Sequence, residues 1–281
     1  METPPPPPHT HTSMPSHSRA AHVASFPDVS PELRARAADS RPSDAEQETP
    51  TARFQPSAIM VATLYYMKPS PFTRPVLLTM KALGITLELK EVNTFKGEQL
   101  KPEFVAINPQ HTVPTLVDGD LTVCESKAIC TYLIAKHGKD DDPLYPRDPK
   151  VRARVDSLLY FDMGTLWARF SGYFFPIRSG KATPETSQES LGKLHEALGW
   201  LDGFLTRGRF AAGTDHVTVA DLVLVANVSG FEAGGILPDK YHNIRAWLDR
   251  CKKEMAGYEE ANGEGVKFFG EFVKTTLKGG Q

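Results

Sequence analysis

The chain has 281 residues, enough for one or two domains at roughly 100–200 residues each. Its 32 basic and 34 acidic side chains give a formal net charge of −2, which excludes a strongly basic surface for nucleic acid or an anionic membrane. Three cysteines cannot all pair with one another and no apolar run approaches the roughly 20 residues that span a bilayer, so we expect a cytoplasmic protein in a reducing compartment.

The N-terminal segment differs in composition from the rest of the chain. Residues 1–58 hold 11 of the 23 prolines, and the run Pro4–Pro8 favours polyproline II, which has no internal hydrogen bonds. Because the segment has little apolar surface to bury, we predict a disordered, proline-rich extension over residues 1–59. It lacks the apolar stretch of a secretory signal and has too many acids for a transit peptide. A proline-rich ligand for an adaptor domain and an alternative start at Met60 stay open.

The next part of the chain alternates between strand and helix patterns. The predicted elements are a strand at 61–66, a helix at about 70–84, a strand at 86–92, a short helix at about 100–107, strands at 115–117 and 121–124, and a helix at 126–137. Ser70 and Pro71 suit the N-cap and first position of the first helix. The order combines a parallel βαβ half with an antiparallel ββα half, which is typical of the thioredoxin-like fold.

The remainder of the chain has a helical pattern. Residues 140–149 are charged and contain three prolines, which indicates a linker between domains. Five or more amphipathic stretches and no strand pattern then predict an all-α domain over 150–281. Thr218 and Asp221 fit a capping box at the start of one helix. Asn227-Val-Ser229 fits a glycosylation acceptor but falls within an apolar helix, so we do not assign it that role.

Several motifs together resemble one known family. They are Leu64-Tyr-Tyr, Ser70-Pro with Arg74, Lys96-Gly-Glu-Gln-Leu-Lys-Pro-Glu-Phe104, Asn108-Pro-Gln-His-Thr-Val-Pro-Thr-Leu116, Glu125-Ser-Lys-Ala-Ile129, Leu159-Tyr-Phe-Asp-Met163 and Thr218-Val-Ala-Asp-Leu222. Through them, residues 61–278 resemble the cytosolic glutathione transferases, most closely the insect delta and epsilon classes. The resemblance implies a thioredoxin-like glutathione-binding domain at 60–139, an all-α substrate domain at 150–281 and a homodimer. Glutathione would be the co-substrate, with no metal.

Ser70 has two compatible roles. By its local sequence it is a helix N-cap, and the resemblance implies that its hydroxyl also donates a hydrogen bond to the glutathione sulfur. A free thiol has a pKa near 8.5, so only a small part of it is the nucleophilic thiolate at neutral pH. A hydroxyl hydrogen bond and a helix N-terminus together could lower this pKa by about one to three units, at about 1.4 kcal/mol per unit.

The resemblance also implies which residues bind the other parts of glutathione. It implies a cis Val113–Pro114 bond whose Val113 main chain pairs with the cysteinyl part like an added strand. His111 would contact the glycyl carboxylate, and Gln99 stands where many relatives have a second histidine. The implied glutathione-binding set is Gln99, His111, Thr112, Val113, Pro114, Glu125, Ser126, Lys127 and Asp156, with Asp156 reaching across the dimer. Lys127 occupies a place often held by arginine, so it keeps the charge but loses the bidentate geometry.

We expect a hydrophobic substrate pocket between the two domains. The candidate residues are Phe72, Met163, Trp167, Phe170, Phe268, Phe269 and Phe272. Aromatic stripes more often form protein cores, so that alternative stays open for each of them. The pocket would accept hydrophobic electrophiles without identifying any one of them.

The predicted function is that of a glutathione S-transferase in the detoxification of xenobiotics, including insecticides. The same thiolate could serve dehydrochlorination or peroxide reduction. The alternative is a non-catalytic protein of the same fold that carries apolar ligands or acts as a scaffold. A glutaredoxin-like redox mechanism is not favoured, because the active position is Ser70 and no Cys-x-x-Cys motif is present.

Overall fold

The computed structural model describes residues 62–279, so the predicted extension over 1–59 lies outside the described residues. The first part of the described chain forms β1 (Thr63–Tyr66), α2 (Thr73–Leu83), β2 (Glu88–Glu91), the 3-10 turns η1 (Thr94–Lys96) and η2 (Glu98–Leu100), α3 (Pro102–Val105), β3 (Thr115–Asp118), β4 (Leu121–Val123) and α4 (Ser126–His137). Each predicted strand and helix of this part is present, with shifted ends in several cases.

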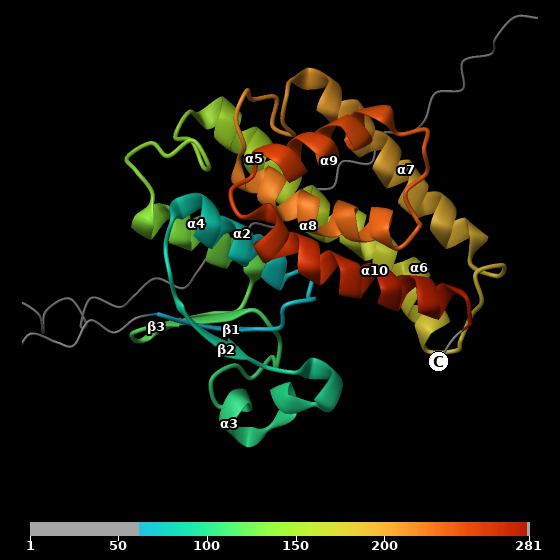
Figure 1. Cartoon of the computed structure of the whole chain (residues 1–281), viewed down its shortest axis with the longest axis horizontal. Coiled ribbons are helices and arrows are strands. Elements are labelled where there is room, and N and C mark those ends of the chain that lie inside the picture. Colours follow the sequence, from blue (N-terminus) through green and yellow to red (C-terminus); the bar gives the residue numbers. More distant parts are fainter. Residues whose placement is uncertain (1–61, 280–281) are drawn as a thin grey trace, which may run out of the picture. The chain divides into compact units, whose positions relative to one another are not determined.

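The four strands form one mixed sheet in the order β2-β1-β3-β4. β1 runs parallel to β2 and antiparallel to β3, and the register places Leu64 of β1 between Leu89 and Leu116. Leu64 and Leu116 have no solvent exposure, because α2 and α4 cover one face of the sheet while α3 lies on the other (Figure 1). This arrangement confirms the predicted thioredoxin-like fold.

The second part of the described chain is helical, as predicted. It comprises α5 (Pro149–Phe161), the π-helical segment η3 (Asp162–Trp167), α6 (Ala168–Arg178), α7 (Gln188–Phe204), η4 (Leu205–Arg207), α8 (Val219–Ala233), α9 (His242–Glu254), the π-helical segment η5 (Glu259–Gly263) and α10 (Glu264–Leu277). Two π-helical segments in one chain are notable, because such segments are rare and often occur at functional sites. Each of them holds a buried polar residue, Asp162 in η3 and Asn262 in η5.

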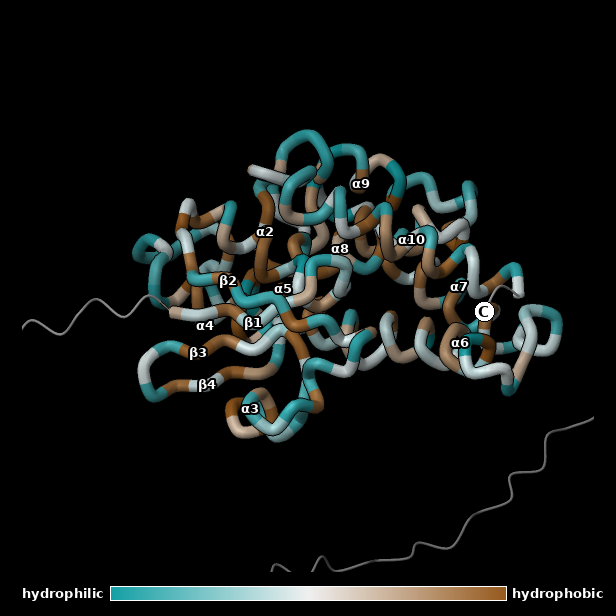
Figure 2. The backbone as a smooth tube through the Cα atoms, turned by 60° about the horizontal axis from the view of Figure 1, so that its bottom comes forward, coloured by the Kyte–Doolittle hydropathy of each residue, from teal (hydrophilic) through white to brown (hydrophobic). Residues whose placement is uncertain are grey.

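Helix α8 is the centre of the core. Every residue from Val219 to Phe231 is buried, and α8 packs against α2, α5, α9 and α10. The predicted capping box starts it: Asp221 Oδ2 accepts from the N–H of Thr218 at 2.9 Å, and Asp221 Oδ1 accepts from Trp247 Nε1 at 2.9 Å. The outer loops around α9 are mostly hydrophilic, whereas α2 carries a hydrophobic stretch (Figure 2). None of the helices in residues 62–279 is long and apolar enough to cross a membrane.

Candidate active site

Ser70 lies half-buried in the turn between β1 and α2. Its carbonyl oxygen accepts hydrogen bonds from the N–H groups of Thr73 at 3.1 Å and Arg74 at 3.2 Å, and its Oγ accepts from the N–H of Phe72 at 3.3 Å. Ser70 therefore makes the bonds of a cap, although the regular turns of α2 begin at Thr73 because Pro71 and Phe72 form a turn. Its hydroxyl hydrogen has no acceptor within residues 62–279, so it can point to a ligand.

The loop before β3 is organised around Asn108, which the sequence analysis did not single out. This fully buried amide donates to the carbonyl and the Oγ1 of Thr112, each at 3.1 Å, and to Thr115 Oγ1 at 2.9 Å. The Val113–Pro114 bond is cis, as predicted. The N–H and C=O of Val113 make no hydrogen bond with the described part of the chain, so they remain available to a ligand.

Two other predicted residues flank this loop. His111 is exposed and adopts a left-handed backbone, with φ 46° and its N–H bonded to the Asn108 carbonyl at 2.8 Å. Gln99 is half-buried in η2, and its Oε1 is buried without a hydrogen-bond partner among the described residues. Both side chains therefore have unused hydrogen-bonding capacity, as ligand-binding residues would.

The start of α4 provides a potential anion-binding site. Glu125 is the exposed N-cap residue, and Ser126 is buried at the first helical position. The first N–H groups of a helix have no intrahelical partners and carry the positive end of the helix dipole, so they suit a carboxylate. The predicted helix bounds of 126–137 match those observed.

Lys127 has a partner that the sequence analysis missed. Its Nζ lies 2.8 Å from Oδ2 of Asp162, a residue of η3 with no solvent exposure, and Asn227 Nδ2 donates to the other carboxylate oxygen at 2.8 Å. Burial raises the pKa of Asp162, while Lys127 and Asn227 oppose that rise. The ammonium predicted to reach glutathione is thus bound to a buried acid of the helical part. The only local indication was an acid within an otherwise apolar stretch, Leu159-Tyr-Phe-Asp-Met163.

Asp156 has a partner within its own chain. Tyr145 donates its hydroxyl hydrogen to Asp156 Oδ1 at 2.8 Å. This bond joins the middle of α5 to the segment that precedes the helix. The predicted contact of Asp156 across a dimer stays a prediction.

The predicted aromatic residues separate into core and surface. Phe170 is fully buried against Phe231 and Phe174, and Phe269 is buried beside Arg74, so we correct the expectation that these two line an open pocket. Both lie on helix faces that other helices cover. Met163 is 45% exposed on η3.

The remaining aromatic residues contact one another in two separate groups at the surface. Phe72 packs edge-on against Trp167 with ring centroids 4.6 Å apart, beside the Lys127 ammonium. Phe268 and Phe272 both contact Phe95 of η1, at 5.9 and 5.8 Å between centroids. Phe95 is 52% exposed and was not predicted to take part.

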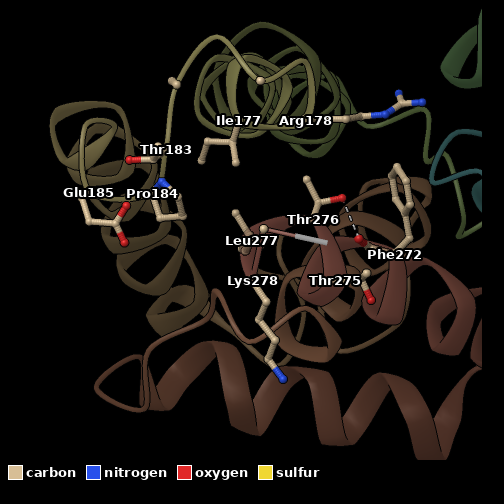
Figure 3. Close-up of a pocket in the computed structure, with 13 residues that line it drawn as sticks. Ile177, Arg178, Thr183, Pro184, Glu185, Phe272, Thr275, Thr276, Leu277 and Lys278 are labelled. Atoms are coloured by element: carbon tan, nitrogen blue, oxygen red, sulfur yellow. Dashed lines mark hydrogen bonds between the residues drawn. The ribbon is translucent and has the colours of Figure 1, made fainter. Parts of the chain in front are cut away.

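A cavity of about 740 Å³ lies between the end of α6, the segment that follows it, and the last turns of α10 (Figure 3). Ile177, Leu277 and Phe272 contribute apolar surface to it, and Thr183 contributes a hydroxyl group. Phe272 is the predicted pocket residue that lines it. Within the described residues, no cluster of three or more His, Cys, Asp or Glu side chains could hold a metal ion.

The described residues combine a thioredoxin-like part with a helical part, and a serine with a free hydroxyl hydrogen precedes the first helix of the described chain. This is a two-part α/β and all-α protein, and comparisons with known proteins identify its family. Residues 64–141 match the family model of the glutathione S-transferase N-terminal domain, and residues 184–250 match that of the C-terminal domain. The chain is 44% identical to glutathione S-transferase D7 of Anopheles gambiae over 222 residues, which cover 78% of this chain and 100% of the relative. The chain belongs to the glutathione S-transferase family.

Solved structures agree with this assignment. A delta-class glutathione transferase of Nilaparvata lugens superposes with a TM-score of 0.72 and 45% identity, covering 76% of this chain and 99% of the other. A glutathione transferase homologue of Drosophila mojavensis, solved with bound glutathione, gives a TM-score of 0.69 and 34% identity, covering 77% and 98%. These matches confirm the predicted resemblance to the insect delta and epsilon classes of glutathione transferase.

Proposed function

We propose that the protein is an enzyme that transfers glutathione to hydrophobic electrophiles, with Ser70 as the residue that stabilises the thiolate. The observation that carries the proposal is the unbonded hydroxyl hydrogen of Ser70 at the start of α2, in a chain of this family. The thiol proton leaves to solvent, and the sulfur lone pair then forms a carbon–sulfur bond. With an aryl halide, the carbon–halogen bond breaks and the halide leaves with its electron pair. The same thiolate could remove a proton in dehydrochlorination or attack a peroxide.

Glutathione would bind along the start of α2, the loop before β3 and the start of α4. The free N–H and C=O of Val113 suit the cysteinyl main chain, and the start of α4 suits the γ-glutamyl carboxylate, with Ser126 as a donor. Glu125 would accept from the α-ammonium group. His111, Thr112 and Gln99 would hold the glycyl end. Lys127 would act chiefly by fixing the start of α4 near the γ-glutamyl end, because Asp162 already binds and balances its ammonium.

The electrophile would contact the aromatic residues that are exposed or half-buried. Phe72 with Trp167, and Phe95 with Phe268 and Phe272, offer apolar surface from both parts of the chain. Aromatic faces of this kind suit flat hydrophobic compounds, including xenobiotics and insecticides. They do not select a single substrate.

We further propose a cytoplasmic homodimer. The three cysteines of the chain are free thiols, which suits a reducing compartment. Tyr160 and Met163, at 69% and 45% exposure, offer apolar surface at the end of α5 and in η3 for a second copy. Asp156 lies one turn before Tyr160 on α5, which suits the cross-dimer contact predicted for it.

The decisive experiment compares the wild type with Ser70→Ala in the conjugation of glutathione to a generic aryl halide. We expect kcat/KM to fall by about tenfold to a hundredfold, as removal of one to two units of thiol pKa stabilisation predicts. Ser187→Ala is the matched control, because Ser187 starts α7 and its carbonyl accepts from Leu191 N–H at 3.0 Å, far from Ser70 in sequence.

Two outcomes would contradict the proposal. A wild type that binds glutathione but shows no turnover with a panel of electrophiles would support the carrier alternative. Turnover that Ser70→Ala leaves unchanged would show that another group stabilises the thiolate.

A further inference from the structure

Arg74 is a fully buried cation in the first turn of α2. Its Nη1 donates to Asn262 Oδ1 at 2.7 Å, while its Nε and Nη2 have no hydrogen-bond partner in the part of the chain that the structure describes. Burial lowers the pKa of this guanidinium to about 9, which leaves it charged at neutral pH. A buried charge without an opposite charge is strongly unfavourable, so its presence calls for a reason.

The acids on the elements around Arg74 are exposed, like Glu271 of α10, or bonded to other groups. Helix α2 packs against α4, α8 and η5, with α10 following directly after η5. The ion pairs made by these acids are Glu259 with Lys267, Glu260 with Lys81, Glu264 with Lys68, Glu232 with Lys252, and Asp162 with Lys127. Asp221 accepts the bonds of the α8 cap, Glu125 before α4 is exposed, and Lys136 and His137 lie at the far end of α4. Burial raises the pKa of Tyr258, so this phenol near Arg74 stays neutral.

The contacts that hold Arg74 are neutral and closely packed. Asn262, which has no solvent exposure, donates through Nδ2 to Ser229 Oγ at 3.1 Å, and Ser229 donates to the Val225 carbonyl at 2.6 Å. Gly265 lets α10 approach, because a Cβ there would lie 2.8 Å from Arg74 Cδ and 2.6 Å from the Lys68 carbonyl oxygen. The protein therefore holds the guanidinium tightly without cancelling its charge.

Arg74 is also tied to the proposed catalytic serine. Its N–H donates to the Ser70 carbonyl at 3.2 Å, so the two residues lie one helical turn apart on the same rigid segment. We infer that Arg74 supplies an unneutralised positive charge to the Ser70 site and so favours the thiolate form of bound glutathione. This inference rests on the proposed function. Arg74 is an electrostatic support for the site, since the structure gives it no contact with a substrate position.

The expected size of the shift in the thiol pKa follows from Coulomb's law. A unit charge on the order of 10 Å away, at an effective dielectric constant of about 20, shifts a pKa by about one unit. The thiol of bound glutathione should therefore titrate about one unit higher once the charge is neutralised. Below the thiol pKa, kcat/KM should then fall by about tenfold, and above it the two proteins should converge.

Asn262→Asp is the most informative variant. The aspartate keeps an oxygen acceptor for Arg74 but neutralises the guanidinium charge. Ser229 must turn its hydroxyl hydrogen from the Val225 carbonyl to the new carboxylate oxygen, because it loses the Asn262 amide donor. Asn262→Ala is the matched control, because it removes the hydrogen bond and leaves the charge. The measurement is the thiolate absorbance of glutathione bound to each protein as a function of pH, together with the pH profile of kcat/KM.

We expect the thiol pKa to rise by about one unit in Asn262→Asp and to stay near the wild-type value in Asn262→Ala. Equal thiol pKa values in the wild type and Asn262→Asp would overturn the inference while leaving the proposed function intact. A wild type that fails to bind glutathione, or that leaves its thiol pKa at the free value, would defeat the proposed function and this inference with it. If Asn262→Asp does not fold, Arg74→Gln removes the charge directly and should give the same upward shift, and an unchanged thiol pKa there overturns the inference.

Discussion

The buried ion pair of Lys127 gives the sharpest stability prediction. Lys127→Met removes the ammonium 2.8 Å from Asp162 Oδ2 and leaves a fully buried carboxylate with Asn227 as its one neutral donor. Breaking a buried pair in this way costs roughly 3–5 kcal/mol, because the remaining charge is uncompensated. We therefore expect the free energy of unfolding to fall by about that amount near neutral pH.

The pH dependence follows from the direction of the Asp162 shift. Burial raises the pKa of Asp162, so the folded protein binds more protons there than the unfolded chain does. The contribution of such an acid to stability is fully present below its unfolded pKa and is lost as the pH rises through its folded pKa. Without Lys127 the pKa of Asp162 rises further. The loss in Lys127→Met should therefore shrink as the pH falls through the raised pKa of Asp162 in the variant, by up to about 1.4 kcal/mol per pH unit, and become constant once Asp162 is also protonated in the wild type.

Urea unfolding followed by circular dichroism, at fixed protein concentration and several pH values, measures this effect. Lys136→Met is the control, because Lys136 lies on the same helix and pairs with Asp118 while its side chain is 40% exposed. Exposed pairs contribute little, so its loss should be much smaller. Equal losses in the two variants, or a Lys127→Met loss that is the same in acid and at neutral pH, would refute the reasoning.

Three further outcomes are expected. Gly265→Ala should lower the free energy of unfolding by roughly 1–3 kcal/mol through overpacking, whereas Gly172→Ala, whose Cβ would meet nothing within 4 Å in α6, should raise it by roughly 0.5–1 kcal/mol; urea unfolding of both tests the contrast. Asn108→Ala removes four hydrogen bonds and should cost about 2–3 kcal/mol and raise the KM for glutathione, and a normal KM would contradict a role for this loop. A thiol reagent should label Cys124 first in the native protein, because Cys130 is fully buried and burial raises its pKa to about 11; rapid native labelling of Cys130 would contradict this.

Local sequence patterns were sufficient to predict most of the fold. Helix α4 has its predicted bounds because Ser126 and Gly138 mark its two ends, and the capping box of α8 forms as its residues require. The differences arise at starts of helices. Thr183 and Pro184 would suit the start of α7 by local sequence, but they form a separate turn in which Thr183 and Thr186 bond each other, and the helix begins at Gln188.

The site was predicted less completely, because part of it depends on contacts between distant segments. Asp162 lies within a motif that was recognised, yet its pairing with Lys127 crosses 35 residues and no local periodicity indicates it. The same limit applies to the aromatic residues. Phe269 and Phe268 are adjacent in sequence, but only the packing of α10 against α6 and α8 decides that the first is buried and the second is exposed.

The triplet Asn227-Val-Ser229 shows how the helical part supports both ends of the proposed glutathione site. Asn227 and Ser229 are each 1% exposed, so neither is available as a surface glycosylation site. Residues two apart on a helix point in nearly opposite directions, so one exposed helix could not use both in this way. Helix α8 can, because it is buried on all sides. Its Asn227 supports Asp162 and hence Lys127 at the start of α4, while its Ser229 supports Asn262 and hence Arg74 at the start of α2.

This arrangement gives the two cations different roles. Lys127 is balanced by an acid, so it fixes the position of α4 with little net charge. Arg74 is held by an amide and keeps its charge, and its N–H is bonded to the Ser70 carbonyl. We infer that this unbalanced buried charge, one helical turn after Ser70, favours the negative charge that would form on the sulfur during the proposed reaction. The chain places the balanced pair near the proposed γ-glutamyl end, where the ligand already carries both charges and a strong extra field would not favour either.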